Sequence, residues 1–193
     1  MLRLKQAFDL LKYDVFVLSP ADMLALESTQ TPLSERWLRP ADQPRLATID
    51  VPEGRLAIII FPDPGHSDQT QEQALFDFAR DVRSRGEHNL IIGVSTWGAV
   101  REERFISTME PVFDMVLGSG EGPGYAGLYL RDNKVLWVRA FTKGRNLLTV
   151  TIPELPKPGD KTIWTPEATV KTRAMNLDNS VYPAPQIEEI FQP

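Results

Sequence analysis

The spacing of apolar residues predicts alternating helices and strands over much of the chain. Three longer segments are predicted as helices: residues 2–12, 69–85 and 100–109. Four short, continuous apolar runs are typical of buried strands: residues 15–18, 56–61, 90–94 and 112–117. From residue 56 onward the order is strand, helix, strand, helix, strand. This order is characteristic of α/β proteins, in which helices pack on a sheet.

Antiparallel pairs are predicted before and after this core. Residues 46–50 and the strand at 56–61 are joined by a Pro-Glu-Gly turn. Later, residues 127–131 and 134–140 flank Asp-Asn, which favours a two-residue hairpin turn at 132–133. Residues 147–152 are predicted as a third strand of this later antiparallel group. The expected fold is therefore α/β with mixed sheets.

The composition changes after residue 152. Seven of the 16 prolines lie between residues 153 and 193, with one short strand expected at 168–174 and one short helix at 186–191. This stretch still contains spaced apolar residues, in which disordered tails are poor. We therefore expect a domain over 1–152 and an extended tail over 153–193 that docks on its own domain or on a partner.

Composition and charge narrow the classes of function. The chain has 193 residues, a net charge of −5, two His and no Cys, which excludes disulfides, thiolate metal sites and thiol nucleophiles. The acidic balance argues against nucleic acid as a partner. No apolar run approaches the 18 residues of a transmembrane segment. The first residues lead into an amphipathic pattern and lack the apolar core of a signal peptide.

Three loops follow predicted strands, where α/β sheets place their functional sites. They are residues 18–22 (Leu-Ser-Pro-Ala-Asp), 94–98 (Val-Ser-Thr-Trp-Gly) and 117–124, which contains four glycines. The glycine-rich loop lacks the Gly-x-Gly-x-x-Gly spacing of a dinucleotide site, and a hairpin follows it instead of a helix. It is therefore expected to be a flexible loop instead of a phosphate cradle.

At these loops the chain resembles the calcineurin-like metallophosphoesterases, in the branch of the periplasmic 5′-nucleotidases. The family motifs Gly-Asn-His-Asp/Glu, Ser/Thr-His-x-Gly and Gly-Gly-His-x-His correspond to residues 19–22, 95–98 and 118–122. The family segment Gly-Arg-x-Leu is matched by residues 144–147. The resemblance covers roughly residues 1 to 153. It implies a β-sandwich of mixed sheets flanked by helices, with the C-terminal tail outside it.

The residues that would bind metal in this family are replaced. Family chemistry uses two metal ions, held by His, carboxylate and Asn side chains, to clamp a phosphate and activate a water. The matching ligand positions are occupied here by Pro20, Ala21, Thr96, Gly120 and Gly122. Pro, Ala and Gly side chains have no lone pair to offer a metal. The family's first two ligand motifs, Asp-x-His and Gly-Asp-x-x-Asp, would lie before Met1.

The resemblance thus implies a degenerate, non-catalytic member, without metal or other cofactor, that acts as a structural or binding subunit of a protein assembly. Two alternatives stay open. One is a 5′-nucleotidase-type metal-dependent phosphoester hydrolase whose missing ligands come from elsewhere. The other is a module that binds a small molecule or nucleotide in the old cleft, and four residues would line that remnant cleft: Asp22, Ser95, Trp97 and Glu121.

Other candidates have simpler explanations. Asp63, His66 and Asp68 share one loop and could bind a cation, but a Pro-Gly turn followed by a helix N-cap accounts for them. His88 is expected to be a surface or hinge histidine. Trp97 either caps the old cleft or packs in the core. Five arginines between residues 80 and 104, interrupted by two glutamates, are expected to form a solvated helix face.

Overall fold

The computed structural model describes residues 2–30, 32, 37–39, 41–63, 69–141 and 144–192. Within it the chain forms two compact units. Residues 41–177 make up the larger unit, and residues 1–40 together with 178–193 make up the smaller one. Each unit has its own secondary structure and its own buried cluster, and the two are described separately.

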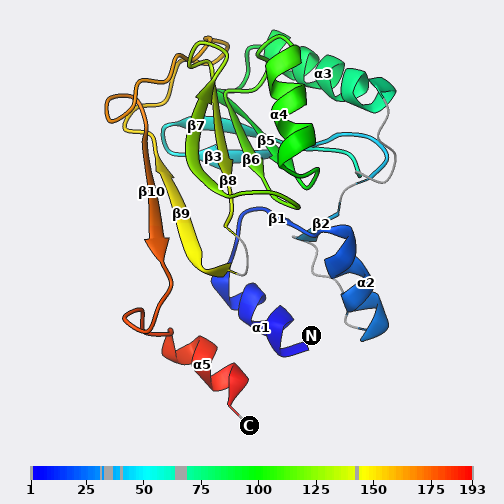
Figure 1. The fold of residues 1–193 in the computed structure, drawn as a ribbon, viewed down its shortest axis with the longest axis vertical. Coiled ribbons are helices and arrows are strands. Elements are labelled where there is room, and N and C mark those ends of the chain that lie inside the picture. Colours follow the sequence, from blue (N-terminus) through cyan, green and yellow to red (C-terminus); the bar gives the residue numbers. More distant parts are fainter. Residues whose placement is uncertain are drawn as a thin grey trace. The chain divides into compact units, whose positions relative to one another are not determined.

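A six-stranded mixed sheet is the framework of the larger unit (Figure 1). The strand order is β3-β4-β5-β6-β8-β7, with the four central strands parallel and β3 and β7 antiparallel at the edges. The strands are β3 (Arg45–Val51), β4 (Gly54–Ile60), β5 (Leu90–Ser95), β6 (Met115–Gly118), β7 (Tyr125–Leu130) and β8 (Val135–Arg139). Apolar side chains on both faces of β4 and β5 are buried, as expected for central parallel strands.

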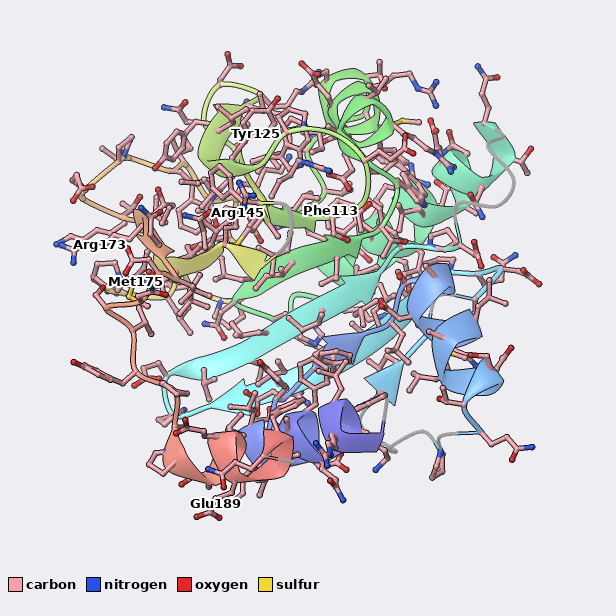
Figure 2. All side chains as sticks on the ribbon, turned by 60° about the horizontal axis from the view of Figure 1, so that its bottom comes forward. Phe113, Tyr125, Arg145, Arg173, Met175 and Glu189 are labelled. Carbon is pink, nitrogen blue, oxygen red and sulfur yellow. The ribbon has the colours of Figure 1, made fainter. Side chains whose placement is uncertain are left out.

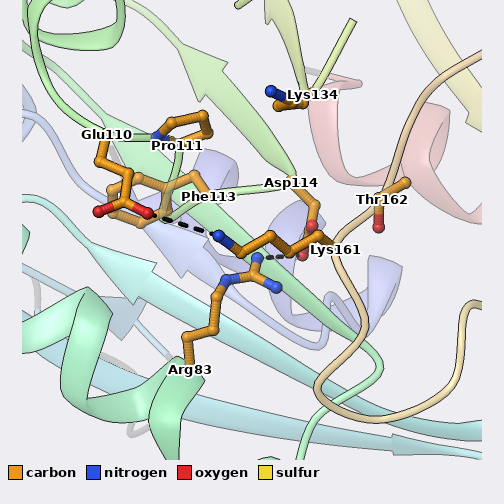
Figure 3. Close-up of a pocket in the computed structure, with 8 residues that line it drawn as sticks. All are labelled: Arg83, Glu110, Pro111, Phe113, Asp114, Lys134, Lys161 and Thr162. Carbon is orange, nitrogen blue, oxygen red and sulfur yellow. Dashed lines mark hydrogen bonds and ion pairs between the residues drawn. The ribbon is translucent and has the colours of Figure 1, made fainter.

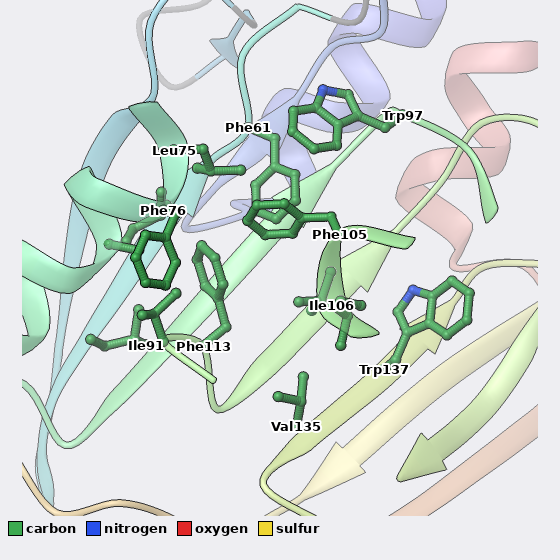
Figure 4. Packing of buried hydrophobic residues seen from close by; sticks show 14 of the residues in the cluster. Phe61, Leu75, Phe76, Ile91, Trp97, Phe105, Ile106, Phe113, Val135 and Trp137 are labelled. Carbon is green, nitrogen blue, oxygen red and sulfur yellow. The ribbon is translucent and has the colours of Figure 1, made fainter. Parts of the chain in front are cut away.

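Helices α3 (Gln69–Ser84) and α4 (Ala99–Thr108) connect the parallel strands and lie on the same face of the sheet (Figure 1). The chain steps from β4 to β5 to β6 in one direction, and right-handed crossovers then place both helices on one side. Between helices and sheet, Phe61, Phe105 and Phe113 contact one another with ring centroids 5.3 to 6.2 Å apart (Figure 4). This aromatic cluster forms the centre of the core.

Asp114, just before β6, joins four parts of the larger unit. Its carboxylate accepts hydrogen bonds from the Ile91 backbone N–H at 2.8 Å and from Nη2 of Arg83 at 2.7 Å. Its backbone carbonyl accepts from Nε1 of Trp164 at 2.7 Å and from the Leu136 N–H at 3.0 Å. Burial raises the pKa of the Asp114 carboxyl, and the Arg83 guanidinium opposes that rise.

Residues 153–177 pack on the larger unit. The Asn89 side chain donates to the carbonyl of Pro156 at 2.8 Å, and the Trp164 backbone N–H donates to the carbonyl of Asn133 at 2.8 Å. The Trp164 side chain is fully buried. Residues 153–177 therefore belong to the same compact unit as residues 41–152.

Strands β9 (Asn146–Thr151) and β10 (Lys171–Asn176) form a separate, antiparallel two-stranded sheet. Leu147 and Met175 are paired across it, and both are exposed. Arg173 and Met175 project outward from β10, away from the six-stranded sheet (Figure 2). The outward face of this small sheet is therefore partly apolar and partly basic.

The smaller unit joins the two ends of the chain. Its elements are α1 (Leu2–Leu11), β1 (Phe16–Val17), α2 (Pro20–Ser28), β2 (Trp37–Leu38) and α5 (Pro185–Phe191). Leu18, Leu26 and Trp37 form its buried cluster, with Phe8 and Phe16 packed against them. The Arg3 guanidinium of α1 donates to the carbonyl of Phe191 in α5 at 3.4 Å.

The predicted α/β class with mixed sheets is confirmed, and two local predictions are wrong. The hairpin loop has four residues, 131–134, because residues 131–133 all adopt left-handed φ angles. The strand near 147–152 pairs with β10, since β8 already has β6 and β7 on its two sides. The division at residue 152 stays a prediction.

We expect Trp164→Ala to lower the free energy of unfolding by about 3–5 kcal/mol, because it removes a large buried side chain and leaves a cavity. Trp164 is 1% exposed, whereas its neighbour Ile163 is 61% exposed. Ile163→Ala is therefore the matched control, with an expected change within about 0.5 kcal/mol. Urea denaturation of both variants measures the difference, and equal effects would show that the 153–177 segment does not contribute to the core.

Candidate functional site

Two of the three predicted strand-end loops meet at the carboxyl edge of the six-stranded sheet. Ser95, the last residue of β5, lies opposite Gly118, the last residue of β6. The Ser119 backbone N–H donates to the carbonyl of Ser95 at 2.9 Å, and the Gly98 N–H donates to the carbonyl of Ser119 at 3.1 Å. Backbone hydrogen bonds thus join the 95–98 loop directly to the 118–124 loop.

Two glycines allow this close approach of the loops. Gly120 and Gly122 have φ angles of 82° and 111°, which side chains rarely tolerate. A Cβ on Gly120 would lie 2.8 Å from the carbonyl oxygen of Thr96, and one on Gly122 would lie 2.5 Å from the Cβ of Ala99. These are the positions matched to the family's last two His ligands, and this backbone has no room for a side chain at either.

A buried ion pair lies beneath the glycine loop. Nη1 of Arg139, at the end of β8, donates to Oε2 of Glu102 in α4. Nε of Arg139 donates to the carbonyl of Pro123 at 3.0 Å, and Nη2 donates to the carbonyls of Gly120 at 3.1 Å and Glu121 at 2.9 Å. All three guanidinium nitrogens are therefore used, and together they fix the loop over the strand ends.

The environment of this pair is dry. The Glu102 and Arg139 side chains are 0% and 1% exposed, and Nε1 of Trp137 also donates to Oε2 of Glu102 at 3.0 Å. Burial raises the pKa of the Glu102 carboxyl, and the Arg139 guanidinium opposes part of that rise. Because two opposite charges are buried together, removing either one leaves the other without compensation. Chemically, the arrangement positions a loop: the guanidinium nitrogens of Arg139 are all bonded, whereas Oε1 of Glu102 has no hydrogen-bond partner in the described residues.

The residues predicted to line a remnant cleft have structural roles. Ser95 is buried, and its hydroxyl accepts a hydrogen bond from the Trp97 backbone N–H at 3.1 Å. Nε1 of Trp97 donates to the carbonyl of Pro62 at 2.8 Å, and the Arg101 guanidinium stacks 3.7 Å from its ring centroid. Trp97 is thus a core residue. Glu121 is exposed, and its backbone carbonyl, instead of its carboxylate, contacts the site.

The third predicted loop belongs to the smaller unit. Ser19 is the N-cap of α2, and its hydroxyl and backbone N–H both donate to the Asp22 carboxylate, at 2.6 and 3.0 Å. Pro20 and Ala21 form the first turn of this helix. Asp22, the acid retained at the matched motif, therefore completes a capping box.

Among the other candidates, His88 differs from expectation. It is buried before β5, with Nε2 3.4 Å from the Thr48 hydroxyl and no hydrogen-bond partner for Nδ1 in the described residues. The surface position expected for His88 is therefore wrong. His66 and Asp68 lie outside the described residues. The arginines of α3 and α4 are only partly solvated, since Arg83 and Arg101 are largely buried in ion pairs.

Sequence reasoning missed Glu102 and Arg139. Glu102 lies three residues after Ala99 and three before Phe105, which places it on the buried stripe of α4. Arg139 directly continues the apolar run of β8. In the sequence, Glu102 and Arg139 are each a single charged residue at a position expected to be buried. Their pairing becomes evident only from the packing of α4 against β8.

Two kinds of feature are absent from the described residues. No group of three or more His, Asp or Glu side chains in the described ranges is arranged to hold a metal ion. Within the same ranges, no helix has the length and apolar character needed to cross a bilayer.

Comparison with known proteins gives little. No family model matches the chain, and no curated protein matches it. Among solved structures, the chain is similar to a hypothetical protein from Thermus thermophilus, with 12% identity and a TM-score of 0.40. The match covers 72% of this chain and 68% of that chain. A likeness at this TM-score carries no argument about function.

We expect Arg139→Met to destabilise the protein by about 3–5 kcal/mol, because it leaves the Glu102 carboxylate buried and unpaired. The double variant Glu102→Gln/Arg139→Met should recover a measurable part of this loss, since no buried charge remains. Urea denaturation at pH 7 measures the wild type, the two single variants Glu102→Gln and Arg139→Met, and the double variant. Arg80→Met, which breaks an exposed pair with Asp77, is the control and should cost under about 1 kcal/mol. Strictly additive losses at residues 102 and 139 would contradict the pairing.

We expect the free energy of unfolding to contain a component from His88 that decreases as the pH falls. Burial, with Arg55 nearby, lowers the pKa of His88, so the folded protein binds a proton less readily than the unfolded chain. The contribution is complete above the unfolded pKa of about 6.5 and is lost as the pH falls below it. The raised pKa values of Glu102 and Asp114 act with the opposite sign.

Denaturation of His88→Gln at pH 7.5 and 5.5 isolates this component, because both carboxyl groups are kept in the variant. The difference in unfolding free energy between the two pH values should shift by the amount that His88 contributes. His66→Gln removes the other imidazole of the chain and serves as the comparison. A wild-type pH dependence in His88→Gln would show that His88 is freely protonated in the folded state.

Proposed function

We propose that this chain is a non-catalytic relative of the metallophosphoesterases that acts as a structural or binding subunit of a larger protein assembly. The observation that carries the proposal is the Arg139 guanidinium, which donates to three loop carbonyls and to Glu102 at the strand ends. In the resembled family, this edge of the sheet would present metal ligands. In this chain a buried ion pair and a closed backbone occupy it.

The shape of the glycine loop supports the same proposal. Gly120 and Gly122 are required by the contact with Thr96 and Ala99, so the loss of His at these positions is matched by a change in packing. A site that had lost its ligands only by point substitution would still have space for them. The loop contact instead indicates a surface that has been remodelled for stability.

The small sheet of β9 and β10 supports the assembly part of the proposal. Leu147 and Met175 are paired on its outward face and are exposed. In the described residues each strand of this sheet has one ladder partner, so each leaves one edge of backbone groups unpaired. Exposed strand edges beside apolar side chains are surfaces that proteins usually cover.

The proposal predicts neither stoichiometric metal nor phosphoesterase turnover. The purified chain is incubated with Mn²⁺, desalted, and examined by elemental analysis and by hydrolysis of bis(p-nitrophenyl) phosphate, with an active metallophosphoesterase run in parallel. We expect turnover at the level of buffer, because the charged groups at the strand ends are already paired. One or more metal ions per chain together with turnover would overturn the non-catalytic assignment.

The proposed role in an assembly is tested in two ways. Light scattering gives the mass of the purified chain, and native mass measurement gives the mass of the protein in extracts of its source. We expect a stable complex that Leu147→Asp weakens. Ile163→Asp places the same charge at another exposed apolar position of the larger unit and should leave the complex intact. A protein that is monomeric in the extract and at high concentration would contradict the assembly role.

A further inference from the structure

We propose that a cavity at the amino ends of β6 and β8 binds a small organic carboxylate. The cavity has a volume of about 160 Å³. Its charged residues come from four stretches of the larger unit: Arg83, Glu110, Asp114, Lys134 and Lys161 (Figure 3). Three of these side chains are cations and two are carboxylates. The way in which they are paired decides which charge the cavity can still accept.

The acid at the base of the cavity is already neutralised. The Asp114 carboxylate is buried and accepts from Nη2 of Arg83 at 2.7 Å. The same guanidinium donates through Nε to the carbonyl of Val112 and through Nη1 to the carbonyl of Asp160, both at 3.1 Å. Arg83 and Asp114 thus form a saturated, neutral pair, and neither is expected to attract a charged ligand.

The lysines at the rim are held weakly by comparison. Lys161 contacts Glu110 at 3.4 Å, with the two side chains 70% and 62% exposed. Lys134 lies 3.9 Å from the Asp132 carboxylate, and the Asp132 side chain lies in solvent. Exposed pairs of this kind contribute little energy and exchange partners readily. The ammonium groups of Lys134 and Lys161 are therefore able to bind an anion at the rim. The Glu110 carboxylate competes with that anion for Lys161.

The walls indicate an organic anion instead of a simple ion. Pro111 and Phe113 supply apolar surface beside the rim, and the lysine stems add methylene groups. A ligand with a compact apolar body would cover this surface while its carboxylate reaches Lys134 and Lys161. This matches the usual form of small-molecule sites, which are mostly apolar with a few placed polar groups.

This inference is independent of the proposed function. The cavity opens at the amino ends of the parallel strands, whereas the Glu102–Arg139 pair lies at their carboxyl ends. None of the residues that line the cavity belongs to the glycine loop. The protein could therefore bind a carboxylate here whether or not it is a subunit of an assembly.

The test uses the full chain with benzoate as the probe, benzamide as its neutral isostere, and inorganic phosphate as an anion without an apolar body. Titrations are followed by backbone amide NMR shifts. We expect benzoate to shift the amides of residues 112–114, 134 and 161–162 and to bind more tightly than the other two probes. Affinity should fall with added salt, because the rim charges are exposed.

Variants at the rim provide the decisive comparison. Lys134→Met and Lys161→Met should each weaken benzoate binding by about fivefold, the worth of one exposed charge contact, while Lys171→Met on β10 should not. Glu110→Gln should strengthen binding, since it removes the competing carboxylate. Equal binding of benzoate and benzamide, phosphate binding as tight as that of benzoate, or unchanged affinity in both rim variants would overturn the proposal.

Discussion

The buried pair of Glu102 and Arg139 is the interaction on which the carboxyl edge of the sheet depends. A buried charge is costly unless an opposite charge is buried beside it, so the two side chains depend on each other. Their meeting sets the distance between α4 and β8 and places a guanidinium under the glycine loop. The loop is held in place because its carbonyls supply the remaining acceptors for Arg139.

The sheet with its helices and the loops at the strand ends are stabilised by different interactions. An α/β sheet keeps its order of strands and helices because burial of apolar faces stabilises it, whatever its loops contain. Strand-end loops are free to change function, and here their polar atoms are bonded to one another. The Asp114–Arg83 pair acts similarly at the opposite end of the strands, where it joins α3 to the segment before β10. Polar groups at both ends of this sheet therefore serve cohesion.

The sequence was sufficient for the elements but not for the pairings between distant charges. Helices such as α3 and strands such as β4 are encoded by local periodicity, which the chain shows clearly. The partner of β9 could not be foreseen, because pairing with β10 depends on β8 being enclosed by β6 and β7. The ion pair of Glu102 and Arg139 was not predicted for a related reason. The two residues are 37 positions apart in the sequence, and nothing at either position indicates the other as its partner. For Trp97 the sequence left two interpretations open, a cap on the cleft or a core residue, and only the packing of the fold places it in the core.

The late position of Trp164 and β10 in the chain has a consequence for synthesis on the ribosome. The larger unit begins at residue 41, but its buried Trp164 and the strand β10 that completes its two-stranded sheet come only after residue 160. The smaller unit starts earlier still and is completed last, when α5 reaches α1. Until residue 164 is made, a nascent chain lacks the indole that donates to the carbonyl of Asp114. The segment before β6 therefore gains its full set of hydrogen bonds only after all six strands of the large sheet have been synthesised.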